Sequence, residues 1–269
     1  MLIGVDIGTG GTKALMLDER GRTLGEAFHE YGVLTPMPSW AEQWPDVWLE
    51  AVTITLKEVL AQSGLNPRDV AAVAISGLYG GSGIPVDKAG EPVRPCMIWM
   101  DRRARKETQW VKDNIPFDKI FSITGNYVDS YYGFTKILWM KNNEPDLWKR
   151  TRQFMTPKDY VIYKFTDIAA TDYSSAGNIG GIFDIHKKGW SQEMSDALGI
   201  PLSLFPERIT KSFDIVGKLN KKYAAAIGVL EGTPIVAGGI DAPVAQFSCG
   251  VVNEGEHVAM TGTSICWGT

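Results

Sequence analysis

The chain has 269 residues, of which 44% are hydrophobic and 22% charged, so it is long enough for one large domain or two smaller ones. Its formal net charge of -4 argues against nucleic acid or an anionic membrane surface as the main partner. The three cysteines and three histidines lack the spacing of a zinc site, no run of about 18 apolar residues predicts a membrane span, and no charged leader opens the chain. We therefore expect a soluble, cytoplasmic protein.

The first element is an apolar strand at residues 2–7, which carries one carboxylate and runs into a loop rich in glycine and threonine. Glycines allow backbone N–H groups to approach an anion closely, while hydroxyls and an ammonium group add donors. An acid beside such a loop is suited to hold a metal ion. The predicted phosphate and metal grip consists of Asp6, Gly8, Thr9, Gly10, Thr12 and Lys13.

The residues after this loop form a short apolar run that ends in a turn, so the loop joins two strands rather than a strand and a helix. A Walker loop needs a helix at this point, and a dinucleotide fingerprint needs a third glycine where Lys13 stands. Both of those nucleotide motifs are disfavoured. An ordinary glycine-rich hairpin turn remains open as an alternative.

Strands and helices alternate along the rest of the chain. Three opening strands and one helix precede further strands, a pattern that predicts an α/β fold with a mixed sheet flanked by helices. The expected elements are strands at 2–7, 12–18 and 23–28, a helix at 46–62 with Asp46 as N-cap or first-turn acid, strands at 70–76, 83–87 and 96–99, mainly helix over 102–165, a strand at 233–238, a helix from Asp241, and a strand at 257–261.

A second acid, Asp241, follows a strand and two glycines at the expected start of a helix. Aspartate is a favoured N-cap, which gives it a purely structural role. Alternatively, the glycines leave room for a substrate and Asp241 accepts a hydroxyl proton during phosphoryl transfer, and the two roles are compatible. Near the C-terminus, Thr261-Gly262-Thr263 repeats the chemistry of the first loop. Two such loops favour a nucleotide phosphate clamp over two unrelated turns.

These residues together resemble the N-terminal half of the FGGY carbohydrate kinases, in particular the xylulose kinases, which have the ribonuclease-H-like fold of actin and hexokinase. Residues 6–13 are similar to the family's first phosphate motif, 239–241 with 249–251 to its catalytic-base segment, and 261–263 to its second phosphate motif. Three further segments, 40–48, 99–103 and 131–143, also match. The last departs from the family signature at Gly133, where Pro, Ser or Thr is usual.

The resemblance implies a role for each matching residue. Asp241 would take the proton from a sugar hydroxyl as it attacks the γ-phosphate of ATP, and Asp6 would hold hydrated Mg²⁺. The first loop, with Gly262 and Thr263 of the second, would bind the phosphates. The substrate side would comprise Tyr79, Trp99, Asp101, Tyr131 and Asp241 itself. Core packing of Trp99, and a surface ion pair of Asp101 with Arg102, Arg103 or Arg105, stay open as structural alternatives.

The segment after the central strand departs from the best-known family members. Xylulose kinases have Ser-Gly-Gln-Met-His-Gly there and glycerol kinases an Arg-Glu pair, whereas residues 76–81 are Ser-Gly-Leu-Tyr-Gly-Gly. Leu78 and Gly80 remove hydrogen-bonding side chains, and Tyr79 is expected to fill the space. We therefore expect a ketose or polyol other than the commonest ones.

Family members are longer and carry a second domain. We expect residues 1–255 to be the sugar-binding domain and 256–269 to be the first strand and phosphate loop of a truncated nucleotide-binding domain, so that the isolated chain has little or no kinase activity. Two other functions stay open. One is a non-catalytic sugar-binding or regulatory domain, and the other is an ATPase switch of the actin or chaperone kind. A homodimer is also left open.

Overall fold

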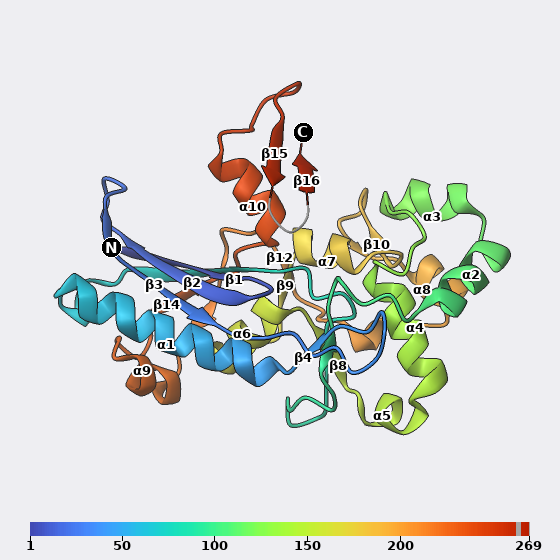
Figure 1. Ribbon diagram of the computed structural model, residues 1–269, viewed down its shortest axis with the longest axis horizontal. Coiled ribbons are helices and arrows are strands. Elements are labelled where there is room, and N and C mark those ends of the chain that lie inside the picture. Colours follow the sequence, from blue (N-terminus) through green and yellow to red (C-terminus); the bar gives the residue numbers. More distant parts are fainter. Residues whose placement is uncertain (262–264, 269) are drawn as a thin grey trace.

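The computed structural model describes residues 1–261 and 265–268, and its centre is a six-stranded mixed sheet (Figure 1). The strand order is β13-β14-β5-β1-β2-β3, in which β1, β5 and β14 run parallel while β1, β2 and β3 form an antiparallel meander. This arrangement confirms the predicted mixed α/β sheet. The strands are β1 (Leu2–Ile7), β2 (Gly11–Leu17), β3 (Thr23–Glu30), β5 (Ala72–Gly77), β13 (Ile215–Lys218) and β14 (Pro234–Val236).

Strand β1 alternates between a buried and an open face of the sheet. Ile3, Val5 and Ile7 are buried, whereas Asp6 points to the opposite, open face. The register sets Asp6 opposite Lys13 on β2 and beside Ser76 on β5, so that these side chains share one face near the end of the parallel strands.

Three helices, α1 (Pro45–Ser63), α6 (Pro157–Thr166) and α9 (Lys221–Ile227), cover the buried face of the sheet (Figure 1). Helix α1 confirms the helix expected at 46–62, and Asp46 lies in its first turn, whereas Trp44 is the N-cap. Helix α10 (Asp241–Ser248) lies on the other side of the sheet, where it contacts β5. The helix expected from Asp241 is therefore confirmed.

A second hydrophobic core lies in a mainly helical lobe beside the sheet (Figure 1). The strands expected at 83–87 and 96–99 are shorter, at β6 (Ile84–Val86) and β7 (Cys96–Met97). They pair with β8 (Gln153–Met155) and β4 (Glu42–Gln43) in two-stranded sheets rather than with the central sheet. The remaining helices are α2 (Arg105–Asn114), α3 (Phe117–Thr124), α4 (Gly133–Asn143), α5 (Pro145–Arg150), α7 (Tyr173–Ile179), α8 (Gln192–Leu198) and the 3₁₀ turns η1 (Pro67–Asp69) and η2 (Leu202–Leu204). The remaining short strands are β9 (Thr171–Asp172), β10 (Phe183–Asp184), β11 (Gly189–Trp190) and β12 (Ile209–Thr210).

After α10 the chain forms an antiparallel hairpin of β15 (Val258–Thr261) and β16 (Ile265–Gly268), a sheet of its own that packs on α10. Strand β15 matches the strand expected at 257–261. Within residues 1–261 and 265–268, no helix has the length and apolar character needed to cross a bilayer.

Candidate active site

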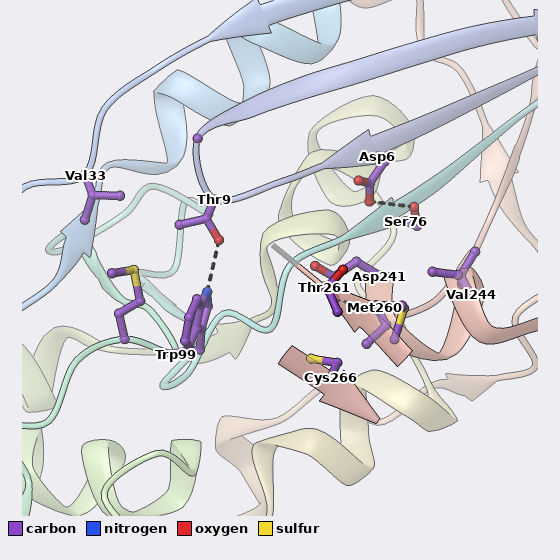
Figure 2. A pocket seen from close by; sticks show the side chains of 14 residues that line it. Asp6, Thr9, Val33, Ser76, Trp99, Asp241, Val244, Met260, Thr261 and Cys266 are labelled. Atoms are coloured by element: carbon purple, nitrogen blue, oxygen red, sulfur yellow. Dashed lines mark hydrogen bonds between the residues drawn. The ribbon is translucent and has the colours of Figure 1, made fainter. Parts of the chain in front are cut away.

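The first loop is the segment 8–10 between β1 and β2. A cavity of about 810 Å³ opens where β1 and β5 end, between this first loop, Trp99 and the start of α10 (Figure 2). Helix α10 and strands β15 and β16 form the wall opposite the first loop. Its lining residues with polar or aromatic side chains, or with loop backbone groups, are Asp6, Thr9, Gly10, Ser76, Trp99, Asp241, Thr261 and Cys266.

Asp6 and Asp241 are the two carboxylates of this cavity. An Asp6 oxygen accepts a hydrogen bond of 2.9 Å from the Ser76 hydroxyl, and an Asp241 oxygen accepts one of 2.7 Å from the backbone N–H of Ala242. Asp241 is the first residue of α10, the N-cap is Ile240, and no side chain caps the helix. The N-cap interpretation of Asp241 is therefore wrong, and its carboxylate faces the cavity (Figure 2).

Both carboxylates bind protons more tightly than ordinary aspartates do. Partial burial raises the pKa of Asp241 to about 6, the N–H of Ala242 opposes this shift, and the negative charge of Asp6 adds to it. Although Asp6 is open to the cavity, the surrounding protein removes part of its water and raises its pKa as well, while the Ser76 hydroxyl lowers it. A carboxylate with a pKa near 6 is a stronger base than an ordinary aspartate, yet it is mostly ionised at neutral pH.

The turn that presents Asp241 is built on glycine. Gly238 has a φ of +60°, and a Cβ there would lie 1.9 Å from the carbonyl oxygen of Ile75, so only glycine fits. The backbone N–H of Gly77 on β5 donates to the carbonyl of Gly239 over 3.2 Å, which continues the parallel pairing beyond β14. The end of β5 and the start of α10 are thereby held together.

Tyr31 supports the first loop through three hydrogen bonds. The Tyr31 hydroxyl donates to the carbonyl of Gly8 over 2.8 Å and is hydrogen-bonded to the Thr12 hydroxyl at 3.0 Å, and the Tyr31 backbone N–H donates to the carbonyl of Gly10. Thr12 is completely buried. Its hydroxyl therefore supports the loop from inside, where the sequence suggested a direct phosphate donor. The role of Tyr31 could not be predicted from the sequence, because a lone tyrosine at the end of a strand carries no local signal.

Of the predicted phosphate-binding residues, Thr9 and Gly10 line the cavity, whereas Gly8, Thr12 and Lys13 do not. Lys13 is exposed on the open face of the sheet, 3.7 Å from a carboxylate oxygen of Glu26. Thr261 of the second loop also lines the cavity. Its partners in that motif, Gly262 and Thr263, lie outside the described residues.

Trp99 lines the cavity and connects its two sides. Its indole N–H donates to the Thr9 hydroxyl over 3.0 Å (Figure 2), while the Gln43 amide donates to the carbonyl of Thr9 over 2.8 Å. The first loop, the expected substrate side and strand β4 therefore meet at one residue, Thr9.

Asp101 is fully buried and does not line the cavity. It forms an ion pair of 2.6 Å with Arg103 and accepts a hydrogen bond from the backbone N–H of Ala41. The expected pairing with a neighbouring arginine is found, but in the interior rather than on the surface. Arg103 in turn lies 3.5 Å above the ring of Trp40, so this pair fixes the segment that carries Trp99.

Tyr79 and Tyr131 form an aromatic pair, with ring centroids 4.9 Å apart, and neither residue lines the cavity. The Tyr79 hydroxyl accepts a hydrogen bond from the backbone N–H of Gly133. A Cβ at Gly133 would lie 2.0 Å from the carbonyl oxygen of Gly81. The two departures from the family pattern, at residues 78–81 and at Gly133, are therefore in direct contact.

Comparison with known proteins agrees with this geometry. Residues 1–248 match the FGGY family of carbohydrate kinases, N-terminal domain. The chain is 31% identical to a xylulose kinase of Staphylococcus xylosus over 264 residues, covering 98% of the chain and 53% of that protein. It is also 30% identical to a glycerol kinase of Halothermothrix orenii over 213 residues, covering 77% of the chain and 42% of that protein. The chain thus spans about half the length of the curated relatives it matches.

Solved structures share the fold. A gluconate kinase from Lactobacillus acidophilus superposes with a TM-score of 0.92 at 22% identity, over 99% of the chain and 53% of that structure. A kinase from Brucella ovis does so with a TM-score of 0.88 at 27% identity, over 96% and 52%. The fold is the ribonuclease-H-like type of the sugar kinases, as the sequence predicted. The chain therefore belongs to the FGGY family of carbohydrate kinases and corresponds to its N-terminal domain.

Proposed function

We propose that this chain supplies the sugar-binding side and the catalytic base of an enzyme that transfers the γ-phosphoryl group of ATP to a hydroxyl of a ketose or polyol. The observation that carries the proposal is the cavity that Asp6, Asp241 and Trp99 line together. An ATP-driven switch of the actin or chaperone kind has no need for an indole and an alcohol-facing base in the same cavity.

In the proposed reaction, Asp241 takes the proton of the attacking hydroxyl. The sugar oxygen forms a bond to the γ-phosphorus, the bond from that phosphorus to the bridging oxygen breaks, and ADP leaves with the electron pair. With a pKa of about 6, Asp241 is ionised at neutral pH and ready to accept the proton. The N–H groups and hydroxyl of Thr9 and Gly10 are suited to steady phosphate oxygens.

The residues present fit a magnesium ion. Mg²⁺ is commonly held by one or two carboxylates together with phosphate oxygens and water, and Asp6 offers such a carboxylate to the cavity. The described part of the chain contains no cluster of three or more ligating side chains, so phosphates and water would complete the shell. Bound there, the ion would neutralise phosphate charge and offset the repulsion that Asp6 exerts on Asp241.

Trp99 and the named relatives support the proposed substrate class. An indole face packs well against the C–H groups of a sugar, and the named relatives include xylulose and glycerol kinases. Leu78 is buried and Gly80 has no side chain, so neither offers the hydrogen bonds of the usual substrate segment. We propose that Tyr79 and Tyr131, which pack on each other but do not line the cavity, limit which sugar fits.

We further propose that residues 1–255 form the sugar-binding domain and that 256–269 begin the nucleotide-binding domain, so that phosphoryl transfer requires chain beyond what is described. The isolated chain would then bind sugar but turn over little ATP. Three unpaired cysteines and the need for ATP suit the cytoplasm. A homodimer stays a prediction.

A thermal-shift screen tests the proposal, because a ligand that binds the folded state raises the melting temperature. The 269-residue chain is titrated with D-xylulose, other ketoses, xylitol and glycerol. We expect one of these classes to stabilise the chain, and Asp241→Asn to weaken its binding about tenfold, since a hydrogen bond to a charged group is lost. The exposed Asp118 provides the control, because Asp118→Asn should bind as the unaltered chain does. Stabilisation by none of the sugars, or equal affinity in the Asp241 variant, would contradict the proposal.

A further inference from the structure

A buried polar cluster lies beneath the turn that presents Asp241. Its centre is Lys158, which is 1% exposed and lies 2.6 Å from a carboxylate oxygen of Asp159 and 2.9 Å from one of Asp172. Burial alone would lower the pKa of Lys158, but the two carboxylates raise it above its ordinary value. The ammonium group therefore stays charged in the interior.

This cluster makes two hydrogen bonds to the backbone that precedes Asp241. The Lys158 ammonium donates to the carbonyl of Ala237 over 3.0 Å. The Ser174 hydroxyl donates to Asp172 and accepts the backbone N–H of Ile240 over 3.0 Å. One bond is made at each end of the turn, so the cluster holds the turn from below while β5 holds it from the side.

The hydrogen bond from the Ile240 backbone N–H to the Ser174 hydroxyl is well placed to affect the orientation of the Asp241 carboxylate. Ile240 is the N-cap of α10 and is bonded directly to Asp241, so its peptide orientation sets where the Asp241 side chain begins. A Cβ on Gly239 would lie 3.1 Å from the Ser174 oxygen, which shows how closely this hydroxyl packs under the turn. A buried N–H group without an acceptor raises the free energy of the folded state. Loss of the Ser174 hydroxyl therefore favours a different backbone conformation of the turn.

We propose that Ser174 is a positioning residue for Asp241: its hydroxyl holds the backbone N–H of Ile240 and so sets the direction in which the adjoining carboxylate enters the cavity. The inference rests on the proposed function only in naming Asp241 as the base. The neighbouring Ser175 shows that the role is specific. Its hydroxyl also donates to Asp172, one residue further along α7, and it has no hydrogen bond to the turn.

The test compares Ser174→Ala with Ser175→Ala, because each removes one hydroxyl bonded to Asp172 from the same helical turn. Amide hydrogen exchange at Ile240 and the ¹³Cγ signal of Asp241 at pH 7.5 are measured by NMR on the 269-residue chain. In Ser174→Ala we expect Ile240 to exchange at least about tenfold faster and the Asp241 signal to move. In Ser175→Ala both should match the unaltered chain, and Ser174→Thr, which keeps the hydroxyl, should restore both.

Similar changes in both alanine variants would overturn the inference, as would unchanged exchange at Ile240 in Ser174→Ala. If that variant does not fold, Ser174→Cys makes the same comparison, because it keeps the volume but accepts hydrogen bonds weakly. The chain is then titrated with D-xylulose, and Ser174→Ala should bind it more weakly than Ser175→Ala. A chain that binds no sugar but shows the exchange effect would refute the proposed function and leave the positioning role intact.

Discussion

The free energy of unfolding should depend on pH through Asp241. The pKa of this carboxyl is about 6 in the folded chain against an ordinary value of 3.8, so the folded state holds the proton more tightly. A raised pKa in the folded state means that stability is present at low pH and is lost as the pH rises from about 4 through about 6. Ionised Asp241 is therefore a destabilising group at neutral pH.

Asp241→Asn removes the charge and keeps an oxygen for the N–H of Ala242. Two pKa units correspond to about 3 kcal/mol, and partial exposure to solvent reduces this to about 2 kcal/mol. Between pH 4 and pH 7.5, we expect the free energy of unfolding of the asparagine variant to rise by about 2 kcal/mol relative to that of the unaltered chain. The variant loses its function as a base. Active-site residues often reduce the stability of the folded state in this way, which is the stability–activity trade-off of enzymes.

Urea unfolding at pH 4 and pH 7.5, followed by tryptophan fluorescence, measures this difference. Asp118→Asn serves as the control for removing an exposed carboxylate, and its effect should be similar at both pH values. If the gap between Asp241→Asn and the unaltered chain were the same at pH 4 and pH 7.5, then Asp241 would not lie in the partly dehydrated, negatively charged cavity described above.

Three further predictions concern the supports of the site. Tyr31→Phe removes the hydroxyl bonded to the Gly8 carbonyl and should cost about 1–3 kcal/mol in urea unfolding; an unchanged unfolding midpoint would contradict this. Asp101→Asn removes one of the two carboxylates that pair with the buried Arg103 and leaves Glu42, so it should cost about 1.5–3 kcal/mol, and a loss below about 0.5 kcal/mol would count against the interior pair. Trp99→Phe keeps a ring but loses the N–H bonded to the first loop, so it should cost about 0.5–1.5 kcal/mol in urea unfolding, and calorimetry should show weaker D-xylulose binding; unchanged affinity would argue against contact with sugar.

The elements that carry local signals were predictable from the sequence. Strand β1, its glycine-rich loop and β2 follow from an apolar run, glycines and a turn, and α1 and α10 begin within one residue of the predicted positions. That Asp6 and Asp241 act at one site was expected from the family resemblance, because no local pattern relates residues that lie so far apart in the sequence.

The supports of the site were not predictable, because their partners are distant and their residue types are ambiguous. Lys158 and Ser174 are residue types that usually lie on the surface, and only the fold brings them beneath the Asp241 turn. Strands β6 and β7 were expected from composition, but their partners β8 and β4 are two or three residues long and carry no periodic signal. Contacts between distant segments therefore determine which strands β6 and β7 pair with.

The most direct test of the account is a crystal structure of the chain with a bound ketose, such as D-xylulose or whichever sugar stabilises it best. We predict that one sugar hydroxyl lies about 2.6–3.2 Å from an Asp241 carboxylate oxygen, with the sugar against the face of Trp99. A sugar bound elsewhere, with Asp241 out of reach of every hydroxyl, would contradict the assignment of Asp241 as the base.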